Sequence, residues 1–490
     1  MKKNLLLALL IICFAACSGR GKKDAEIIIF TTNDMHGRID NFPKVSAYLK
    51  KAKAEHKHVF LFNAGDMFSG NPLIDQYPEK GYPIIDIMNR VGYQLGTFGN
   101  HEFDYGQDML ASRLKDADFP FLLANAEITE PALSQLPEFK PYMTFDVGGI
   151  KMTVISAVEV GSGGTPSTHP DRVKGISFYD PVEKLQEYKC LRKDCNVFIG
   201  LTHIGIEQDI RLAEAMPELD VILGGHSHTR IDTGMIVNSV LITQSESWLK
   251  YLGQTTIIVK NGKVISKSNK LIDLSKVTDT DPSIQKLIDK YKTNDPGSVV
   301  IGQLTNAIKG KEALGSFMTD ALTEGLGLDI AMQNAGGVRV PKIEAGDITI
   351  NDVYSLDPFG NEVIKINMTG AEIKALIEST LRRTRGNSSP DLLISGMLYT
   401  ATVKRGSGET LSIDLKDKNG KPLDMKRTYA VGMNSYIYTK YQFEHADPGV
   451  SLKITSANAL IDYIKQNKAI KSYANENRIK IEQVGTGSTK

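Results

Sequence analysis

The stretch Tyr93–Asp104, which reads YQLGTFGNHEFD, places an apolar run directly before an amide, an imidazole and two carboxylates. Other short apolar runs in the first half of the chain also end in Gly, Asn or His, and they lie at residues 26–33, 58–65, 195–203 and 219–226. Continuous apolar runs are typical of strands buried on both faces of a helix-covered sheet. Helical patterns at residues 42–55 and 180–191 separate them, so the first half of the chain is predicted to be an α/β domain.

Polar side chains follow each run at its carboxyl end, which is where ligands bind in an open α/β sheet. Five of the nine histidines of the chain lie at these ends, so these side chains are expected to converge on one pocket. The residues that could hold a metal there are Asp34, His36, Asp66, Asn100, His203, His226 and His228.

Each of these motifs has an ordinary explanation when it is taken alone. A Gly-Asp pair is usually a turn, and a single histidine is more often a satisfied core or surface residue. Together they offer seven ligands, which is more than one tetrahedral ion needs, and two ions that share Asp66 would use them all. Imidazoles and carboxylates without a thiolate suit zinc, manganese, iron or cobalt.

The composition excludes several classes of protein. With 41% hydrophobic and 23% charged residues over 490 positions, the chain is typical of two or three globular domains. Its formal charge of +1, which becomes −1 if a leader carrying Lys2 and Lys3 is removed, is too small for binding a nucleic-acid polymer. Cys190 and Cys195 are too few for a disulfide framework or a cysteine-based zinc site, and a bridge or two free thiols both remain open.

Residues 1–16 differ from the rest of the chain. Two lysines precede twelve apolar residues, a run too short for a membrane-spanning helix of about 20 residues but suited to an export signal. The ending FAAC resembles a bacterial lipobox, which implies that Cys17 is lipidated and that residues 17–25 form a tether. An ordinary secretory peptide cleaved nearby is the alternative. In both cases we expect an exported protein of the periplasm or cell envelope. In the lipobox case, a lipid at Cys17 is expected to be its only membrane attachment.

The pattern of the sequence changes along the chain. Shorter alternating segments with a hairpin turn at Asn261–Gly262 predict a sheet that completes the first domain, residues 26–275. The polar stretch that follows is bounded by Asp-Pro pairs and is helical in its middle, which predicts an interdomain linker helix at residues 276–297. Residues 298–484 mix helices with strands and are expected to form an α+β domain, followed by a disordered tail at residues 485–490.

The motifs DMH, GD, GNHEFD, THIG and GGHSH, in this order and spacing, resemble those of the calcineurin-like binuclear metallophosphoesterases. The later motifs LGSFMTDAL, NAGGVR, DPFGN and ISG are similar to the second domain of the bacterial periplasmic 5′-nucleotidase and UDP-sugar hydrolase family. The resemblance spans about residues 26–436. It implies a four-layer α/β/β/α metallophosphoesterase domain, a linker helix and an α+β C-terminal domain that binds the substrate.

The resemblance also implies a role for each polar residue of the pocket. One divalent ion would take Asp34, His36, Asp66 and His228, and the other would take Asp66, Asn100, His203 and His226. Such a pair activates a hydroxide for in-line attack on phosphorus. His101 would then stabilise charge on the phosphate, with Asp104 orienting it, a pairing that general acid–base chemistry also supports. Glu102 is expected to be a solvated or capping residue. We expect zinc or manganese, with iron and cobalt as alternatives.

In the second domain, the resemblance implies contacts to the substrate from Asn334, Gly336, Gly337, Arg339, Phe359, Asn361 and Tyr436. Glycines allow close approach of the backbone, arginine offers a forked donor and phenylalanine a stacking face, although without the resemblance these segments would be read as turns. The chain departs from the family pattern because no Gly-Gly-Asp-Gly follows Tyr436, and Asp447 is too distant to replace it. Ser316 stands where some members carry an arginine.

The leading hypothesis is an exported phosphohydrolase that cleaves nucleoside 5′-monophosphates to nucleoside and phosphate. Within enzymes, the alternative is a hydrolase of UDP-sugars, cyclic nucleotides or another small phosphoester. A catalytically inactive surface protein that binds nucleotides is an alternative of another class, and a structural zinc protein is disfavoured because its sites would be closed and four-coordinate. The expected partner is a small phosphoester, with no nucleic-acid polymer, and a monomer is expected.

Overall fold

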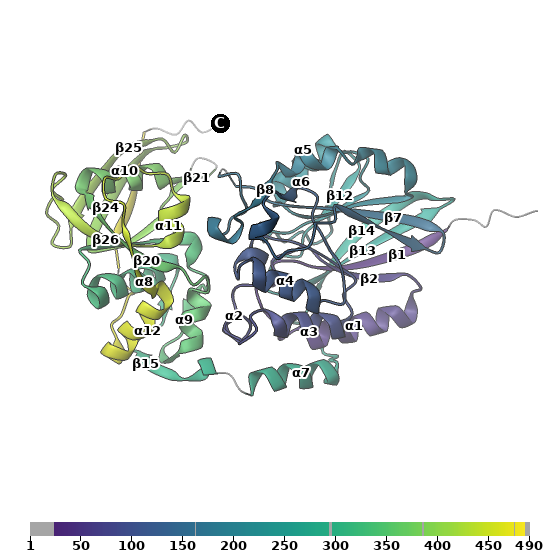
Figure 1. Ribbon diagram of the computed structural model, residues 1–490, viewed down its shortest axis with the longest axis horizontal. Coiled ribbons are helices and arrows are strands. Elements are labelled where there is room, and N and C mark those ends of the chain that lie inside the picture. The colour runs from purple at the N-terminus through teal and green to yellow at the C-terminus, as the bar shows by residue number, and fades with distance from the viewer. Residues whose placement is uncertain (1–23, 162, 294–295, 385–386, 475, 486–490) are drawn as a thin grey trace, which may run out of the picture.

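The computed structural model describes residues 24–161, 163–293, 296–384, 387–474 and 476–485. The predicted export signal, Cys17 and nearly all of the predicted tail lie outside these residues. Within the described residues, no helix is both long and apolar enough to cross a membrane. Figure 1 shows two bodies side by side, and the chain crosses from the first to the second between α7 (Pro282–Lys292) and β15 (Val300–Leu304).

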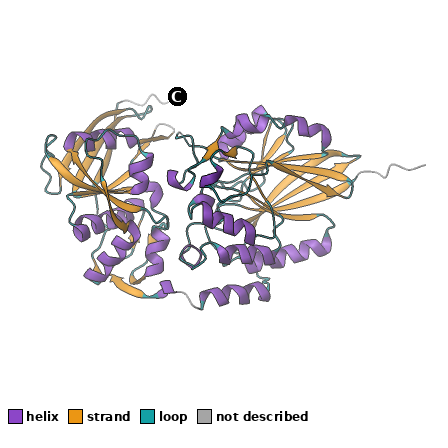
Figure 2. Cartoon of the chain, viewed as in Figure 1, coloured by secondary structure: helices purple, strands orange, loops and turns teal. Residues whose placement is uncertain are grey.

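The first body is built on two six-stranded sheets (Figure 2). One sheet has the order β14-β13-β1-β2-β3-β4, and its strands are β1 (Ala25–Thr32), β2 (Val59–Asn63), β3 (Leu95–Thr97), β4 (Phe121–Leu122), β13 (Tyr251–Lys260) and β14 (Lys263–Asp273). The other has the order β11-β12-β10-β9-β7-β6, and its strands are β6 (Tyr142–Val147), β7 (Ile150–Val158), β9 (Val197–His203), β10 (Val221–Leu223), β11 (Met235–Val237) and β12 (Val240–Thr243). Strands β1 to β4 run parallel to one another, as do β7, β9, β10 and β12.

The two sheets pack face to face through a continuous apolar core that includes Ile27, Ile29 and Leu201. The helices α1 (Phe42–Glu55), α3 (Tyr82–Val91) and α4 (Gln107–Asp116) pack on the outer face of the first sheet. The helices α5 (Pro181–Gln186) and α6 (Ile206–Ala215) cover the second sheet. This is the predicted four-layer α/β/β/α arrangement, and it places the carboxyl ends of both sets of parallel strands at one edge.

The structure shows the conformation of the predicted hairpin turn and the state of the two cysteines. Asn261 and Gly262 both have positive φ, 51° and 76°, and they form the predicted turn of the β13–β14 hairpin. Cys190 is exposed, Cys195 is half-buried and both are free thiols, which is one of the two states that the sequence left open.

The helix α7 (Pro282–Lys292) lies in the segment predicted to link the domains, and it is anchored to the first body. Ile284, Ile288 and Tyr291 belong to the same core as α1 and α3. Asp281, the N-cap of α7, accepts hydrogen bonds from Ser46 Oγ at 2.5 Å and Lys50 Nζ at 2.6 Å, both on α1. The chain therefore leaves the first body only after α7.

The second body surrounds a five-stranded sheet of order β23-β17-β26-β20-β27. Its strands are β17 (Ile330–Asn334), β20 (Glu362–Thr369), β23 (Leu392–Ser395), β26 (Thr428–Asn434) and β27 (Val450–Thr455). Its helices are α8 (Lys311–Leu326), α9 (Ile350–Leu356), α10 (Gly370–Thr380), α11 (Ser435–Lys440) and α12 (Ser456–Asn467). It also has two three-stranded sheets, formed by β15 (Val300–Leu304), β19 (Gly346–Thr349) and β28 (Ala469–Ile470), and by β24 (Met397–Lys404), β25 (Thr410–Asp417) and β29 (Ile479–Val484). Two-stranded sheets are formed by β16 (Ile308–Lys309) with β18 (Lys342–Ile343), and by β21 (Arg382–Thr384) with β22 (Asn387–Ser389). The predicted α+β character is confirmed.

Asp320 on α8 ties this body to the segment that precedes β29. Its side chain is 3% exposed and accepts hydrogen bonds from Arg478 at 2.6 and 3.0 Å, Ser395 Oγ at 2.6 Å and Tyr473 OH at 3.0 Å. Burial raises the pKa of Asp320, but Arg478 and the other donors outweigh it and hold the pKa at about 2. The ionised carboxylate is therefore the form that stabilises the fold.

We expect Asp320→Asn to lower the free energy of unfolding at pH 7 by about 3–5 kcal/mol, because Arg478 would be left without its buried partner. The depressed pKa gives the wild type a contribution that is present above the ordinary aspartate pKa of 3.8 and is lost as pH falls toward 2. Denaturation followed by circular dichroism should therefore show a difference in the free energy of unfolding between wild type and Asp320→Asn that becomes smaller below pH 4. The exposed Asp414→Asn is the matched control, and equal stability of Asp320→Asn and wild type at pH 7 would contradict the assignment.

Candidate metal centre and active site

The predicted ligands come from the ends of five strands and the loops that follow them. Asp34 and His36 follow β1, Asp66 follows β2 and Asn100 follows β3. His203 ends β9, whereas His226 and His228 follow β10. The structure brings all seven side chains to one edge of the first body, where His226 and His228 are half-buried and the other five residues are buried.

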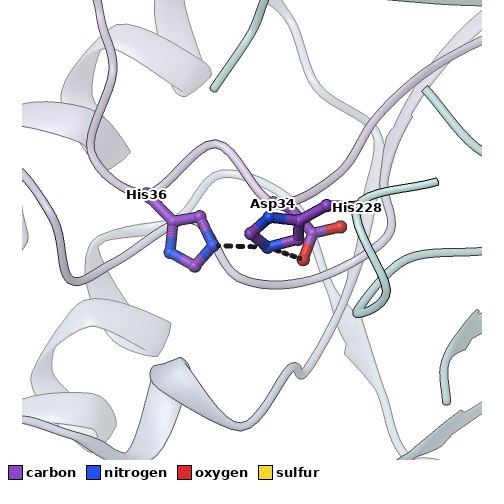
Figure 3. A group of neighbouring side chains, drawn as sticks. All are labelled: Asp34, His36 and His228. Carbon is purple, nitrogen blue, oxygen red and sulfur yellow. Dashed lines mark hydrogen bonds and ion pairs between the residues drawn. The ribbon is translucent and has the colours of Figure 1, made fainter. Parts of the chain in front are cut away.

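The first group contains Asp34, His36 and His228 (Figure 3). The Nε2 atoms of His36 and His228 lie 3.0 Å apart, and His228 Nε2 lies 3.3 Å from Asp34 Oδ1. His36 Nε2 is also 4.0 Å from Asp66 Oδ2. Two imidazole nitrogens and two carboxylate oxygens therefore face the same small volume, as the donors of a metal site do.

The second group contains Asp66, His203 and His226. His203 Nε2 is buried 3.1 Å from Asp66 Oδ2 and has no hydrogen-bond partner among the described residues. The Asn100 amide oxygen lies 3.1 Å from His226 Nδ1. Asp66 therefore approaches both groups, as the predicted shared ligand would, and Asp34 Oδ1 also lies 3.8 Å from His203 Nε2. The buried His203 nitrogen fits an ion beside these carboxylates.

Hydrogen bonds to the backbone orient two of these imidazoles. His203 Nδ1 lies 2.7 Å from the Ala64 carbonyl oxygen, and His36 Nδ1 lies 3.1 Å from that of Ser69. In metal sites such contacts fix the ring so that the other nitrogen faces the ion. In both residues the other nitrogen is the one that faces Asp66.

The backbone at this edge is unusual. Five of the seven candidate ligands have positive φ, namely Asp34 (48°), His36 (48°), Asp66 (53°), His226 (80°) and His228 (52°). Residues other than glycine adopt this conformation rarely, and it is concentrated at functional sites. The donor set, the unused nitrogen of His203 and this backbone together fit a pair of divalent cations.

His101 and Asp104 form the predicted pair. His101 Nδ1 lies 2.6 Å from Asp104 Oδ2, which also accepts a hydrogen bond from Ser69 Oγ at 2.7 Å. Burial lowers the pKa of His101, but Asp66 and Asp104 raise it by more, so its pKa lies above the ordinary value. His101 Nε2 is 3.9 Å from Asp66 Oδ2, and geometry alone also permits a group of His36, Asp66 and His101. The separation of His101 from the ligands stays a prediction.

Glu102 was expected to be a solvated or capping residue, and the first alternative is wrong because Glu102 is 1% exposed. Its carboxylate accepts hydrogen bonds from the backbone N–H groups of Asp66 at 2.8 Å, Met67 at 2.8 Å and Gly99 at 2.5 Å. Burial and the Asp66 charge raise the pKa of Glu102 to about 7. Glycine is required at position 99, since a Cβ there would collide with the Asp66 carboxylate. Glu102 thus holds the Asp66 loop against the GNHEFD segment.

Two loops of the second body reach this centre. The Arg339 guanidinium lies 3.4 Å from His36 Nε2. The ring of Phe359 stacks on His101 with centroids 5.6 Å apart, and Arg339 lies 5.5 Å from the Phe359 centroid. Burial lowers the pKa of Arg339, while Asp66, Asp104 and Asp34 oppose that shift. The second body therefore contributes a cation and an aromatic face directly beside the predicted metal ligands.

A cleft of about 1050 Å³ is lined by residues of both bodies, including Asp66 and His101 of the first. From the predicted substrate contacts, its lining includes Asn334, Gly336, Arg339, Phe359, Asn361 and Tyr436. Gly337 is buried and does not line it. Asp447 does not line it either, because its carboxylate accepts hydrogen bonds from Asn367 at 2.5 and 3.1 Å. The segment Ser167–His169 and residues such as Arg172 and Lys311 line the cleft without any signal in the sequence that singles them out.

A two-sheet α/β body with paired His/Asp groups at its strand ends, facing a second body across a cleft, is the architecture of a metallophosphoesterase. The calcineurin-like phosphoesterase family matches residues 28–230, and the 5′-nucleotidase C-terminal domain family matches residues 295–443. The chain belongs to the family of proteins that combine these two domains. Its two bodies therefore match a metallophosphoesterase domain and a 5′-nucleotidase C-terminal domain.

Individual relatives agree with this assignment. The chain is 27% identical over 84% of its length to the trifunctional nucleotide phosphoesterase protein YfkN of Bacillus subtilis, but it spans only 32% of that protein. It is 26% identical over 94% of its length to snake venom 5′-nucleotidase of Crotalus adamanteus, of which it covers 90%. The 5′-nucleotidase precursor from Thermus thermophilus has a similar structure, with a TM-score of 0.81, 26% identity and coverage of 93% of this chain and 99% of that one.

We expect Glu102→Gln to lower the metal content and to slow phosphoester hydrolysis by about 10–100-fold, the usual effect of losing a residue that orients metal ligands. Glutamine supplies one acceptor oxygen for three backbone donors and turns an N–H toward them. Elemental analysis and phosphate release measured on the same preparation would check this. Glu55→Gln, at an exposed position on α1, is the matched control. Full metal content and full rate in Glu102→Gln would show that Glu102 does not position Asp66.

Proposed function

We propose that this chain is an exported phosphohydrolase that cleaves nucleoside 5′-monophosphates to nucleoside and phosphate. The observation that carries the proposal is the juxtaposition of the seven candidate ligands with Arg339 and Phe359 across one cleft. One wall offers groups that neutralise a phosphate, and the other offers amide and aromatic groups suited to a nucleoside.

The candidate ligands divide into two sets that share Asp66. One ion would be held by Asp34, His36, Asp66 and His228, and the other by Asp66, Asn100, His203 and His226. Zinc or manganese suits these donors, with iron and cobalt as alternatives. When bound, the two ions would neutralise charge on the phosphate and lower the pKa of a water molecule.

Side chains outside these sets would bind and orient the phosphate. Asp104 holds His101 through Nδ1, so that Nε2 faces the centre and can donate a hydrogen bond to a phosphate oxygen or to the leaving oxygen. Arg339 offers a forked donor that matches a phosphate.

The nucleoside would lie against the second body. Phe359 and Tyr436 offer aromatic faces, and Asn334, Gly336 and Asn361 offer polar or backbone groups in the same cleft. We assign Gly337 a role in shaping the loop that follows β17 rather than a contact with the substrate, since Gly337 is buried. Asn434 links two parts of this subsite within the second body. Its Nδ2 donates to Asn334 Oδ1 at 2.9 Å, and its Oδ1 accepts from the Ile437 N–H of α11 at 2.8 Å.

Export and domain limits are part of the proposal. The pattern of residues 1–17 supports an exported protein anchored by a lipid at Cys17 in the periplasm or cell envelope. The family matches at residues 28–230 and 295–443 support a metallophosphoesterase domain at 26–275, a linker at 276–297 and a substrate-binding domain at 298–484. We expect the protein to act as a monomer on a small phosphoester.

A panel of substrates tests the proposed activity. The metal-loaded protein would be assayed for hydrolysis of AMP, UDP-glucose, a 2′,3′-cyclic nucleotide and an aryl phosphate, each with and without EDTA. We expect AMP to be the best substrate and EDTA to abolish turnover. Because no Gly-Gly-Asp-Gly follows Tyr436 and Asp447 bonds Asn367 instead, hydrolysis of UDP-sugars or other phosphoesters is the second candidate. Turnover of the aryl phosphate with no turnover of AMP would favour this candidate. The absence of any EDTA-sensitive hydrolysis would favour a nucleotide-binding protein.

A further inference from the structure

The side chain of Lys440, the last residue of α11, reaches from the second body to a loop of the first. Its Nζ donates to Thr165 Oγ1 at 2.6 Å and to the Pro166 carbonyl oxygen at 3.2 Å, and Lys440 and Thr165 are 275 positions apart. Burial lowers the pKa of Lys440, while the Glu159 carboxylate opposes that shift. Lys440 is half-buried and both of its hydrogen-bond partners lie on the first body, so this contact joins the two domains.

The segment that Lys440 contacts is hydrogen-bonded directly to two predicted active-site residues, Asn100 and Asp104. The Ser167 carbonyl oxygen accepts a hydrogen bond from Asn100 Nδ2 at 3.1 Å, which turns the Asn100 amide oxygen toward His226. Thr168 Oγ1 donates to Asp104 Oδ1 at 2.8 Å, opposite the oxygen that holds His101. The segment Thr165–Thr168 therefore fixes one predicted ligand and the acceptor of the predicted His–Asp pair.

The other end of the contact belongs to the substrate wall. Tyr436 and Lys440 are four residues apart on α11, so they lie on the same side of the helix. Tyr436 lines the cleft, and Asn434 caps the helix while bonding Asn334. The helix α11 is thus tied to the substrate contacts at its start and to the first body at its end.

We propose that Lys440 is a positioning residue that clasps the substrate-binding domain to the segment Thr165–Thr168 and thereby sets the positions of Asn100 and Asp104. The inference rests on the proposed function, because Asn100 and Asp104 are assigned there to hydrolysis. It gives a role to the segment after Tyr436, where the chain departs from its family. Arg339, Phe359 and the packing of α2 (Pro72–Asp75) against α9 join the domains independently of Lys440, so the clasp acts on alignment rather than on folding.

The kinetic test compares Lys440→Met, Lys440→Arg, Thr165→Val and the double variant Lys440→Met/Thr165→Val. We expect Lys440→Met to lower kcat about tenfold for AMP and for an aryl phosphate alike, with KM nearly unchanged and metal content retained, because the reacting groups are misaligned. Lys440→Arg should restore most of the rate, and the double variant should be no slower than Lys440→Met, since both remove one contact. The exposed Lys426→Met is the matched control. A higher KM for AMP alone would instead make Lys440 a substrate contact and overturn the clasp.

Hydrogen exchange tests the clasp without relying on turnover. Peptides covering residues 159–169 and 99–104 should exchange faster in Lys440→Met than in wild type or Lys426→Met. The backbone hydrogen bonds of the loop that holds Thr165, such as Gly161 N–H to Thr165 O at 3.0 Å, should open more often once Lys440 no longer contacts it. If the wild type hydrolyses no phosphoester, the proposed function fails while this result still decides the clasp. Unchanged exchange in both peptides would overturn the inference.

Discussion

Replacing Asp66 by alanine is expected to remove both bound metal ions and to slow phosphoester hydrolysis by at least about 10³-fold. Asp66 Oδ2 lies 3.1 Å from His203 Nε2 and 4.0 Å from His36 Nε2, so this carboxylate approaches both candidate groups and is the predicted shared ligand. Its other oxygen accepts the His101 backbone N–H at 3.0 Å. Elemental analysis of the dialysed variant, together with phosphate release from AMP, would measure both effects.

Asp40→Ala is the control for this experiment, since Asp40 is an exposed aspartate of the same domain whose partner is Lys292. It should keep both ions and the wild-type rate. If Asp66→Ala retained two ions per chain, Asp66 would not bridge them, and the division of the ligands into two sets sharing Asp66 would be wrong.

His101→Ala is expected to slow hydrolysis by roughly 10²–10⁴-fold while both metal ions remain bound, which is the range for loss of a general acid or base. Asp104 takes Nδ1 of His101 at 2.6 Å, which leaves Nε2 for the proposed contact with the phosphate. Elemental analysis and kcat for AMP should therefore separate this variant from Asp66→Ala.

Two comparisons make the test of His101 decisive. His56→Ala, on the surface of the same domain, should leave rate and metal content unchanged. Asp104→Asn should also lower the rate while both ions remain bound, because it disturbs the tautomer and the orientation of the His101 ring. Metal loss in His101→Ala equal to that in Asp66→Ala would mean that His101 is a ligand, as the group of His36, Asp66 and His101 would allow.

The parts of the fold that follow from local pattern were predictable. The helix expected at residues 42–55 is α1 (Phe42–Glu55), and the five apolar runs are the strands β1, β2, β3, β9 and β10. Polar residues placed directly after buried strands must meet at one edge of the sheets, which is why all seven candidate ligands could be named from the sequence. Their roles as ligands stay predictions.

The parts that depend on contacts distant in sequence were not predictable. Glu102 is buried because Gly99 brings two loops together, and no single loop reveals this. Residues 276–297 were predicted as a linker from their polar composition, yet Ile284, Ile288 and Tyr291 give α7 an apolar face that packs on the first body. Lys440 and Thr165 are 275 positions apart, and only the docking of the two domains brings them together.

Anomalous diffraction from manganese-soaked crystals of the protein tests the central claim most directly. We expect two peaks about 3.5–4 Å apart, with the Asp66 carboxylate between them. The ligands of the two peaks would be Asp34, His36 and His228 on one side and Asn100, His203 and His226 on the other. A single peak, or a peak coordinated by His101, would contradict a centre of two ions bridged by Asp66.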